Sequence, residues 1–369
     1  MKRIILLLFF VSTLAFAESV YSPAWGFTID LPEGYKLVGG DGKEKFSFSG
    51  PNELSFDLVV FNGTYKSIKE MVTDINSKLG NRGTADFYDY NGKQAAIMEL
   101  NFMNKTGWGL CLTLSSNNTA TMLLALSYNA AGKEMDLFHM SALDSISPTD
   151  AELRYPGPIM EYGFPRGEKK KESLALKEVS AMIKENDAEA AQVLVEREFE
   201  LLITYMDSPL WQEAWIRYYR FIYRDSFDRI ADAAAMIVRY WGGPPSGIEE
   251  KRAFAQKALT FVQGFAYERN FKGSDFVNLV TSITKGECDC DSRAMLWAII
   301  LAKANIRSAM MVSREYSHAM GLADIAGAGA RFESKGTNWL VAETTANVDI
   351  GRIAQNQSNT DAWLGIVFE

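Results

Sequence analysis

Hydrophobic and polar residues alternate over short stretches of residues 18–150, a pattern typical of β-strands with one buried face. Helical spacing occurs twice in this region, at residues 65–80 and at about 133–146, and Asn91-Gly92 indicates a hairpin turn. Strands are expected at residues 27–32, 45–50, 54–61, 84–90, 93–103, 108–116 and 119–128. This order predicts an α+β domain in which two helices cover one face of an antiparallel sheet.

The middle of the chain changes from strand periodicity to helix periodicity. Four of the ten prolines fall within residues 147–168, and we place a linker at residues 151–168. Residues 169–245 are expected to be helical almost throughout, with helices at 175–187, 189–206 and 209–241. The last of these helices carries an apolar stripe that we interpret as helix core rather than as a ligand-binding surface. Its members are Trp211, Trp215, Tyr218, Tyr219 and Ile222.

Residues 246–369 predict a third unit, built around one buried helix. A helix is expected at residues 249–268, and a nearly continuous apolar run at 294–302 marks a second helix that is buried on most sides. Short strands are expected at residues 308–313, 318–325, 338–345 and 363–368. The expected arrangement is a buried helix packed on an antiparallel sheet, so the whole chain is predicted to be of the α+β class.

Composition and charge restrict the partners. The chain has 369 residues, of which 47 % are hydrophobic and 23 % charged, as in ordinary globular proteins. Its net charge is −8, and its only short basic run, EKKKE at residues 168–172, is too small for a nucleic-acid interface. We therefore expect no nucleic acid among the partners. The sequence leaves the oligomeric state open.

The first residues, MKRIILLLFFVSTLAFAES, indicate a secretory signal peptide. A basic start is followed by a short apolar run and by the small residues Ala15-Phe16-Ala17, a typical cleavage pattern. We expect cleavage near Ala17 after residues 1–17, export to the periplasm or the medium, and no permanent membrane span. An exported protein meets an oxidising environment, but its three cysteines are an odd number, so at least one thiol is expected to be free or paired outside the chain.

Two of the three cysteines stand in KGECDCDSRAMLWAIILAKANI, residues 285–306, at the start of the buried helix. A thiol at a helix N-terminus can be activated by the helix dipole, and the free N–H groups there can bind an oxyanion. Asp289 and Asp291 oppose this activation, so a cationic partner is needed. His318 follows at the start of an expected strand, and Glu343 near the end of the next can orient the imidazole. The other histidine, His139, is interpreted as a partly buried helix residue without a catalytic role.

Residues 246–369 resemble the transglutaminase-like superfamily, a branch of the papain-like cysteine enzymes. The resemblance lies in the cysteine that opens a buried helix, in the His-Ala pair of HAM and in the acid of VAETT. It implies a thiol enzyme that acts on amide bonds of a peptide or protein through Cys290, His318 and Glu343, most simply a peptidase or amidase. The spacing to Ile306 favours Cys290 over Cys288 as the nucleophile. The N-terminal domain, with WGFTIDLPEGYKL, is faintly similar to the small α/β domains related to the photosystem II PsbP protein.

Other interpretations remain open at this point. Glu343, Asn305 and Met320 depart from the residues that are common in the family, so a catalytically degenerate binding module is one alternative and a protein-cross-linking transamidase is another. A disulfide between Cys288 and Cys290 would be strained but could act as a redox latch, with Cys288 as a redox neighbour of the nucleophile. Zinc bound by Cys288, Cys290 and His318 is disfavoured by the Cys-x-Cys spacing, and no metal or cofactor is expected.

One further site residue is predicted. Tyr267, in FAYERN ahead of the cysteines, is a candidate oxyanion donor in addition to the backbone N–H of Cys290. The alternative is a core tyrosine that caps the helix expected at 249–268.

Overall fold

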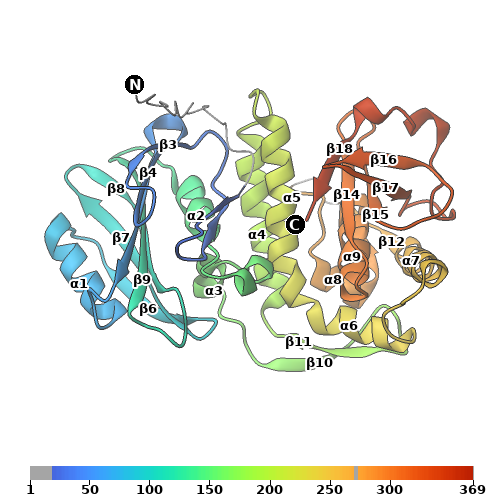
Figure 1. Ribbon diagram of the computed structural model, residues 1–369, viewed down its shortest axis with the longest axis horizontal. Helices are drawn as coiled ribbons and strands as arrows, with labels where there is room; N and C mark the ends of the chain where they lie inside the picture. Colours follow the sequence, from blue (N-terminus) through green and yellow to red (C-terminus); the bar gives the residue numbers. More distant parts are fainter. Residues whose placement is uncertain (1–18, 270–272, 369) are drawn as a thin grey trace, which may run out of the picture.

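The structure of the protein is a computed structural model that describes residues 19–269 and 273–368. Two sheets, one from each half of the chain, lie on either side of a central group of helices (Figure 1). The mixture of helices and antiparallel sheets confirms the predicted α+β character. The signal-peptide prediction for residues 1–17 lies outside the described residues.

The N-terminal sheet has seven antiparallel strands in the order β3-β4-β5-β9-β8-β7-β6. Their bounds are Lys36–Gly40 (β3), Lys45–Ser49 (β4), Ser55–Asn62 (β5), Ala85–Tyr90 (β6), Lys93–Phe102 (β7), Lys105–Thr113 (β8) and Thr121–Ala130 (β9). A separate short pair precedes it, β1 (Val20–Tyr21) and β2 (Thr28–Ile29), so the strand expected at residues 27–32 is reduced to two residues.

The two helices of this domain lie on opposite faces of the sheet, and the prediction that they share one face was wrong. Helix α1 (Ile68–Leu79) packs on the side of β7 that carries Ala96 and Met98. Helix α2 (Asp136–Asp144) belongs to the core on the other side, with Ile97. The long, nearly continuous apolar runs of the central strands are explained by this burial on both faces.

The segment expected to be a linker forms two short helices, η2 (Asp150–Arg154) and α3 (Pro158–Gly163). Pro158 occupies the first turn of α3, where its missing N–H costs nothing. The Asp144 carboxylate accepts hydrogen bonds from the N–H groups of Ile159 and Met160, at 2.8 and 3.0 Å. These contacts attach the segment to α2.

Residues 169–184 form a hairpin of β10 (Lys169–Ser173) and β11 (Ser180–Lys184), so the helix expected at 175–187 was wrong. Within β11 the buried Ala181 and Ile183 flank an exposed Met182, a strand alternation too short to outweigh the helical propensity around it. Three helices follow: α4 (Asp187–Ile203), α5 (Trp211–Arg229) and α6 (Ala231–Tyr240). The single helix expected at 209–241 is divided at Ile230, whose backbone is not helical.

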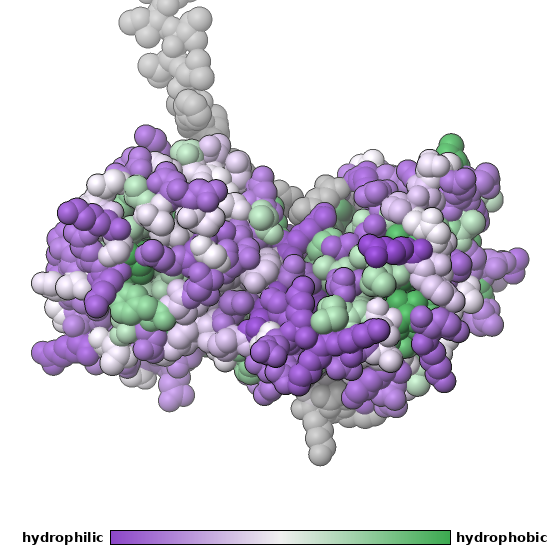
Figure 2. All heavy atoms as spheres, turned by 90° about the horizontal axis from the view of Figure 1, so that it is seen from below, coloured by the Kyte–Doolittle hydropathy of each residue, from purple (hydrophilic) through white to green (hydrophobic). Residues whose placement is uncertain are grey.

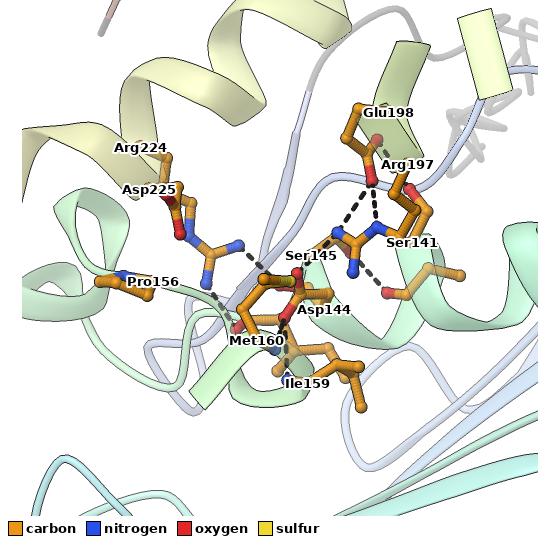
Figure 3. Close-up of polar contacts among 12 residues, drawn as sticks. Ser141, Asp144, Ser145, Pro156, Ile159, Met160, Arg197, Glu198, Arg224 and Asp225 are labelled. Carbon is orange, nitrogen blue, oxygen red and sulfur yellow. Dashed lines mark hydrogen bonds and ion pairs between the residues drawn. The ribbon is translucent and has the colours of Figure 1, made fainter. Parts of the chain in front are cut away.

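A buried ion pair and a buried hydrogen bond join the N-terminal domain to this helical group (Figure 3). Arg197 of α4 donates to Asp144 of α2 at 2.7 Å and forms a salt bridge with Glu198 at 2.8 Å. Arg217 of α5 donates to Glu198 at 2.8 Å and to the Ser141 hydroxyl of α2 at 2.9 Å. The three helices are therefore held together by charges that have almost no access to solvent.

The C-terminal sheet has five antiparallel strands in the order β16-β17-β15-β14-β18, and helix α9 (Cys290–Lys303) packs on β14 and β15. The strands are β14 (Ser308–Ser313), β15 (His318–Ala323), β16 (Arg331–Ser334), β17 (Thr337–Ala342) and β18 (Leu364–Val367). The other elements are α7 (Ile248–Gln263), β12 (Ala266–Tyr267), α8 (Leu279–Lys285), β13 (Glu287–Cys288), η3 (Gln355–Gln357) and η4 (Thr360–Ala362). The sequence did not indicate β16, and the helix expected to reach residue 268 ends at Gln263.

One face of the molecule shows mostly hydrophilic residues, with hydrophobic residues in small separate patches (Figure 2). Within residues 19–269 and 273–368, no helix has both the length and the apolar character needed to cross a membrane.

Candidate active site

The site begins at the first residue of the buried helix α9, which is Cys290. Asp289 is the N-cap of this helix, and its Oδ1 accepts a hydrogen bond from the N–H of Ser292 at 3.0 Å. Cys288 lies outside the helix in β13, where it pairs with Tyr267 of β12. Of the two neighbouring cysteines, therefore, only Cys290 stands in the first helical turn.

Helix α9 is fixed tightly against the sheet that carries His318. The indole N–H of Trp297 donates to the carbonyl oxygen of Ala255 at 3.1 Å, which anchors α9 to α7. On the opposite side, a Cβ at Gly321 would lie 2.5 Å from the Trp297 ring, so only glycine allows β15 to approach this closely. At the start of the same strand, the N–H of Ala319 is near enough to the Cys290 thiol to lower its pKa.

His318 and Glu343 are joined by a hydrogen bond at adjacent strand ends. His318 opens β15, Glu343 follows β17, and these strands are neighbours in the sheet. The distance from His318 Nε2 to Glu343 Oε2 is 2.8 Å, and both side chains are largely buried. This contact leaves Nδ1 as the ring nitrogen that can exchange a proton with another group.

The other oxygen of Glu343 is also fully engaged. Its Oε1 accepts hydrogen bonds from the N–H and the hydroxyl of Thr345, at 2.7 and 2.6 Å. Burial alone would raise the pKa of Glu343, but the hydrogen bonds from His318 and Thr345 outweigh it and lower the pKa. Glu343 is thus an ionised carboxylate at neutral pH and can hold the imidazole in one orientation.

The surroundings of Cys290 disfavour its thiolate. Burial, followed by the nearby carboxyl groups of Asp291 and Asp289, raises the pKa of the Cys290 thiol, whereas the N–H of Ala319 acts in the opposite direction. The thiol donates to Oδ1 of Asp291 at 3.2 Å, and the Tyr219 hydroxyl donates to the other oxygen of that carboxyl group. In the free protein the geometry therefore favours a protonated thiol held by Asp291.

Cys290 and His318 line one cavity of about 230 Å³. The opposite wall comes from α4 and α5. It includes the four aromatic members of the apolar stripe described above, Trp211, Trp215, Tyr218 and Tyr219, which we call the aromatic stripe. The stripe was predicted to be helix core, and this holds for the buried Tyr218, Tyr219 and Ile222. Trp211 and Trp215 are only partly buried.

Tyr267 is next to the thiol, but not as a helix cap. Helix α7 ends before it, and 50 % of the residue is exposed, so the alternative of a core tyrosine that caps helix 249–268 was wrong. Burial of its hydroxyl, the charge of Cys290 and hydrogen bonding to Cys290 raise the pKa of Tyr267. A neutral phenol beside the sulfur can donate a hydrogen bond.

The remaining cysteines and the other histidine do not line this cavity. Cys288 is buried, and burial raises its pKa to about 12. Cys111 lies in the core of the N-terminal sheet, and all three thiols are free. His139 is buried between Ser127 and Asn129, and desolvation lowers its pKa to about 4. It stays neutral in a structural role.

The structure does not assemble the zinc site considered from the sequence. In the part of the chain that is described, the side chains that approach to within 4.8 Å as potential metal ligands are those of Asp289, Cys290 and Asp291, and Cys288 is not among them. Three consecutive residues of one helix start are the acidic surroundings of the thiol and do not form a structural zinc spacing.

Two neighbours of the site were not identified from the sequence. The ring of Trp363, which precedes β18, stands edge-on to His318 at 6.3 Å between centroids. Tyr219 binds Asp291, although it lies 72 residues earlier in the chain. No local pattern connects such distant residues; only the aromatic stripe on α5 marked the region of Tyr219 as unusual.

No family model matches the chain, and no curated protein matches it. Among solved structures, the chain is similar to a protein of Bacteroides thetaiotaomicron VPI-5482 whose crystal structure was determined at 1.50 Å resolution. The two are 12 % identical, the similarity covers 60 % of this chain and 78 % of that chain, and the TM-score is 0.22. A score this low carries no argument about fold or function.

Proposed function

We propose that the protein is an exported thiol enzyme with a transglutaminase-like core that hydrolyses amide bonds of a peptide or protein. The observation that carries this proposal is the His318–Glu343 pair, at 2.8 Å, on the same cavity as the Cys290 thiol. The pair would activate and then recycle a nucleophile, and the first turn of α9 supplies N–H groups near a bound carbonyl.

The raised pKa of Cys290 decides how the attack would begin. Because the thiol is protonated at rest, His318 Nδ1 must take its proton as the sulfur bonds to the carbonyl carbon. Glu343 stabilises the imidazolium that forms. The proton then passes to the leaving nitrogen, the C–N bond breaks, and water, deprotonated by the imidazole, releases the acyl group from the sulfur. In this proposal the Cys290 N–H and the Tyr267 hydroxyl donate to the oxyanion.

The departures from the family pattern are compatible with an intact core. Asn305, at the position usually held by glycine, has a φ of 58°, a left-handed conformation that asparagine tolerates better than most residues. Met320 is fully buried on the face of the sheet away from α9. Neither change introduces strain or a charge at the site.

Incubation of the mature protein with a peptide library, with and without an added primary amine, tests this proposal. We expect hydrolysis products in both samples and none with the Cys290→Ser variant. Incorporation of the amine without net hydrolysis would replace the hydrolase by a transamidase.

A catalytically inactive binding module is the second candidate, and the carboxyl groups that raise the pKa of Cys290 favour it. The discriminating measurement is the mass of the protein after exposure to a peptide with an electrophilic carbonyl. A covalent adduct on Cys290 that requires His318 supports the enzyme. Reversible binding with no adduct supports the module.

A further inference from the structure

The wall that α5 contributes to the cavity is a specificity surface, and we infer that it selects peptides with an aromatic side chain next to a carboxylate. This inference rests on the proposed function, since it names the substrate class of the same site. The aromatic ring would lie against Trp215 and Trp211, and the carboxylate would bind Arg314.

The rings of this wall form a continuous row that ends at the catalytic helix. The centroids of Trp211 and Trp215 are 6.0 Å apart, those of Trp215 and Tyr219 are 6.3 Å apart, and both pairs are tilted. Tyr219 in turn donates to Asp291 beside the thiol. A ligand ring can extend this row at the partly buried tryptophans, since offset and edge contacts between rings at such distances are favourable.

The size of the cavity limits what can enter. Its volume of about 230 Å³ is below the ~300 Å³ at the lower end of sites for drug-sized ligands, so it suits one large side chain. Phe199 and Leu202 of α4 provide the apolar surface behind the rings. An aromatic side chain therefore fits the cavity in both shape and chemistry.

Arg314 supplies the charge at this surface. Its guanidinium lies over the Trp211 ring, 5.5 Å from the centroid, and no ion pair to it occurs among residues 19–269 and 273–368. By contrast Arg269, on the same cavity, is bound to Asp275 at 2.7 Å. A guanidinium stacked on an aromatic face is already oriented to bind a carboxylate through two N–H groups.

Calorimetric binding to the Cys290→Ser protein tests this inference without turnover. Three acetylated and amidated dipeptides serve as probes: Phe-Asp, Ala-Asp and Phe-Asn. We expect Phe-Asp to bind about tenfold more tightly than either of the others. The loss of one ring contact, or of one ion pair, weakens binding by about that factor. Trp215→Ala should abolish the preference for Phe over Ala, and Arg314→Ala the preference for Asp over Asn.

The matched control is Arg307→Ala. Arg307 also stacks on a tryptophan, Trp339, at 5.3 Å, but it lies outside the cavity, so both preferences should persist. Equal or undetectable binding of the three peptides would overturn the inference, as would preferences that survive both cavity variants. Selective binding without any cleavage by the wild-type protein would instead overturn the hydrolase proposal. Thiol-dependent cleavage with neither preference would overturn the specificity surface alone.

Discussion

At the scale of single residues, the site is governed by the balance of charge around one sulfur atom. The helix N-terminus and the Ala319 N–H favour the thiolate of Cys290, whereas burial and the carboxyl groups of Asp291 and Asp289 disfavour it. Asp291 is the closest of the unfavourable groups, because it accepts the thiol hydrogen bond directly. The resting thiol is therefore less reactive than its position at a helix start alone would predict.

Asp291→Asn should make Cys290 more reactive. Burial raises the pKa of Asp291, but its ionised form raises the pKa of the thiol, so a neutral amide at this position lowers the pKa of Cys290 and leaves a larger fraction as thiolate near pH 8. Each unit of pKa is worth ~1.4 kcal/mol and raises the thiolate fraction about tenfold. The rate of iodoacetamide labelling at Cys290, followed by mass spectrometry against pH, measures the shift. Asp324→Asn, which removes an exposed carboxylate paired with Arg307 outside the cavity, should leave the rate unchanged. Slower labelling of Asp291→Asn would contradict this account.

The two neighbouring cysteines should respond differently to the same reagent. Cys290→Ser should abolish both amidase activity and alkylation at pH 8, whereas Cys288→Ser should retain most of both. Cys288 is fully buried and does not line the cavity, whereas Cys290 lines it, so the reagent can reach Cys290 alone. The opposite result would assign the nucleophile to Cys288. Labelling that requires prior reduction would show that the two thiols form a disulfide in the exported protein.

Glu343→Gln should lower turnover by about 10²-fold to 10⁴-fold, because a neutral amide cannot stabilise the imidazolium. Its effect on stability should depend on pH. The folded-state pKa of Glu343 is below the ordinary value of 4.5, so its stabilising contribution is present above pH 4.5 and is lost as the pH falls through the folded pKa. Urea unfolding at pH 7 and at pH 3 should give a stability difference between wild type and variant that shrinks at low pH. An equal stability difference at both pH values would show that the ionisation of Glu343 beside His318 contributes nothing to stability.

At the scale of secondary structure, the sequence predicted the elements whose burial pattern is local. Strands β4 to β9 and helix α9 were expected near their observed bounds, because their apolar runs are long enough to identify them. The hairpin β10–β11 was missed because the two-residue alternation of Ala181 and Ile183 is too short to distinguish from helix. Helices α1 and α2 lie on opposite faces of the sheet because of packing between distant segments. No local sequence pattern indicates this packing.

The same limit applies to the site. Cys290, His318 and Glu343 each lie at the start or end of a predictable element, so their candidacy could be inferred from the sequence. The aromatic wall could not, because α5 reaches Cys290 only through the packing of the central helices against the C-terminal unit.

Gly321→Ala tests how closely β15 must approach α9. A methyl group at this position would lie 2.5 Å from the Trp297 ring, so the strand must move away from the helix. Overpacking of this kind costs about 1–3 kcal/mol, measured by denaturant unfolding. Because His318 opens the same strand, turnover should fall as well.

Gly336→Ala is the matched control, since Gly336 lies in a turn with open space around its Cα and no contact with α9. Its φ of 72° costs some stability but should leave turnover intact. Full activity in Gly321→Ala would show that the strand position is not critical.

At the scale of the whole molecule, the central helices connect the N-terminal domain to the site. Helix α5 carries Arg217, which is bound to Glu198 and Ser141, and two residues later Tyr219, which is bound to Asp291. One face of the helix is thus fixed by the Glu198 carboxylate of α4 and the Ser141 hydroxyl of α2, while its aromatic face forms the cavity wall. The N-terminal domain, although distant from Cys290, helps to set the position of that wall.

Arg217→Ala should therefore affect both stability and the site. The variant leaves the Glu198 carboxylate, 1 % exposed, with Arg197 as its remaining cationic partner, and breaking a buried pair costs about 3–5 kcal/mol. Denaturant unfolding measures this loss, and Lys78→Ala, which removes an exposed pair with Asp74, should cost at most about 1 kcal/mol. The double variant Arg217→Met with Glu198→Met removes both charges and should recover most of the stability.

If α5 transmits the change, cleavage by Arg217→Ala should also slow at a temperature where the variant remains folded. Unchanged cleavage there would show that the ion pairs hold the domains together without positioning the cavity wall.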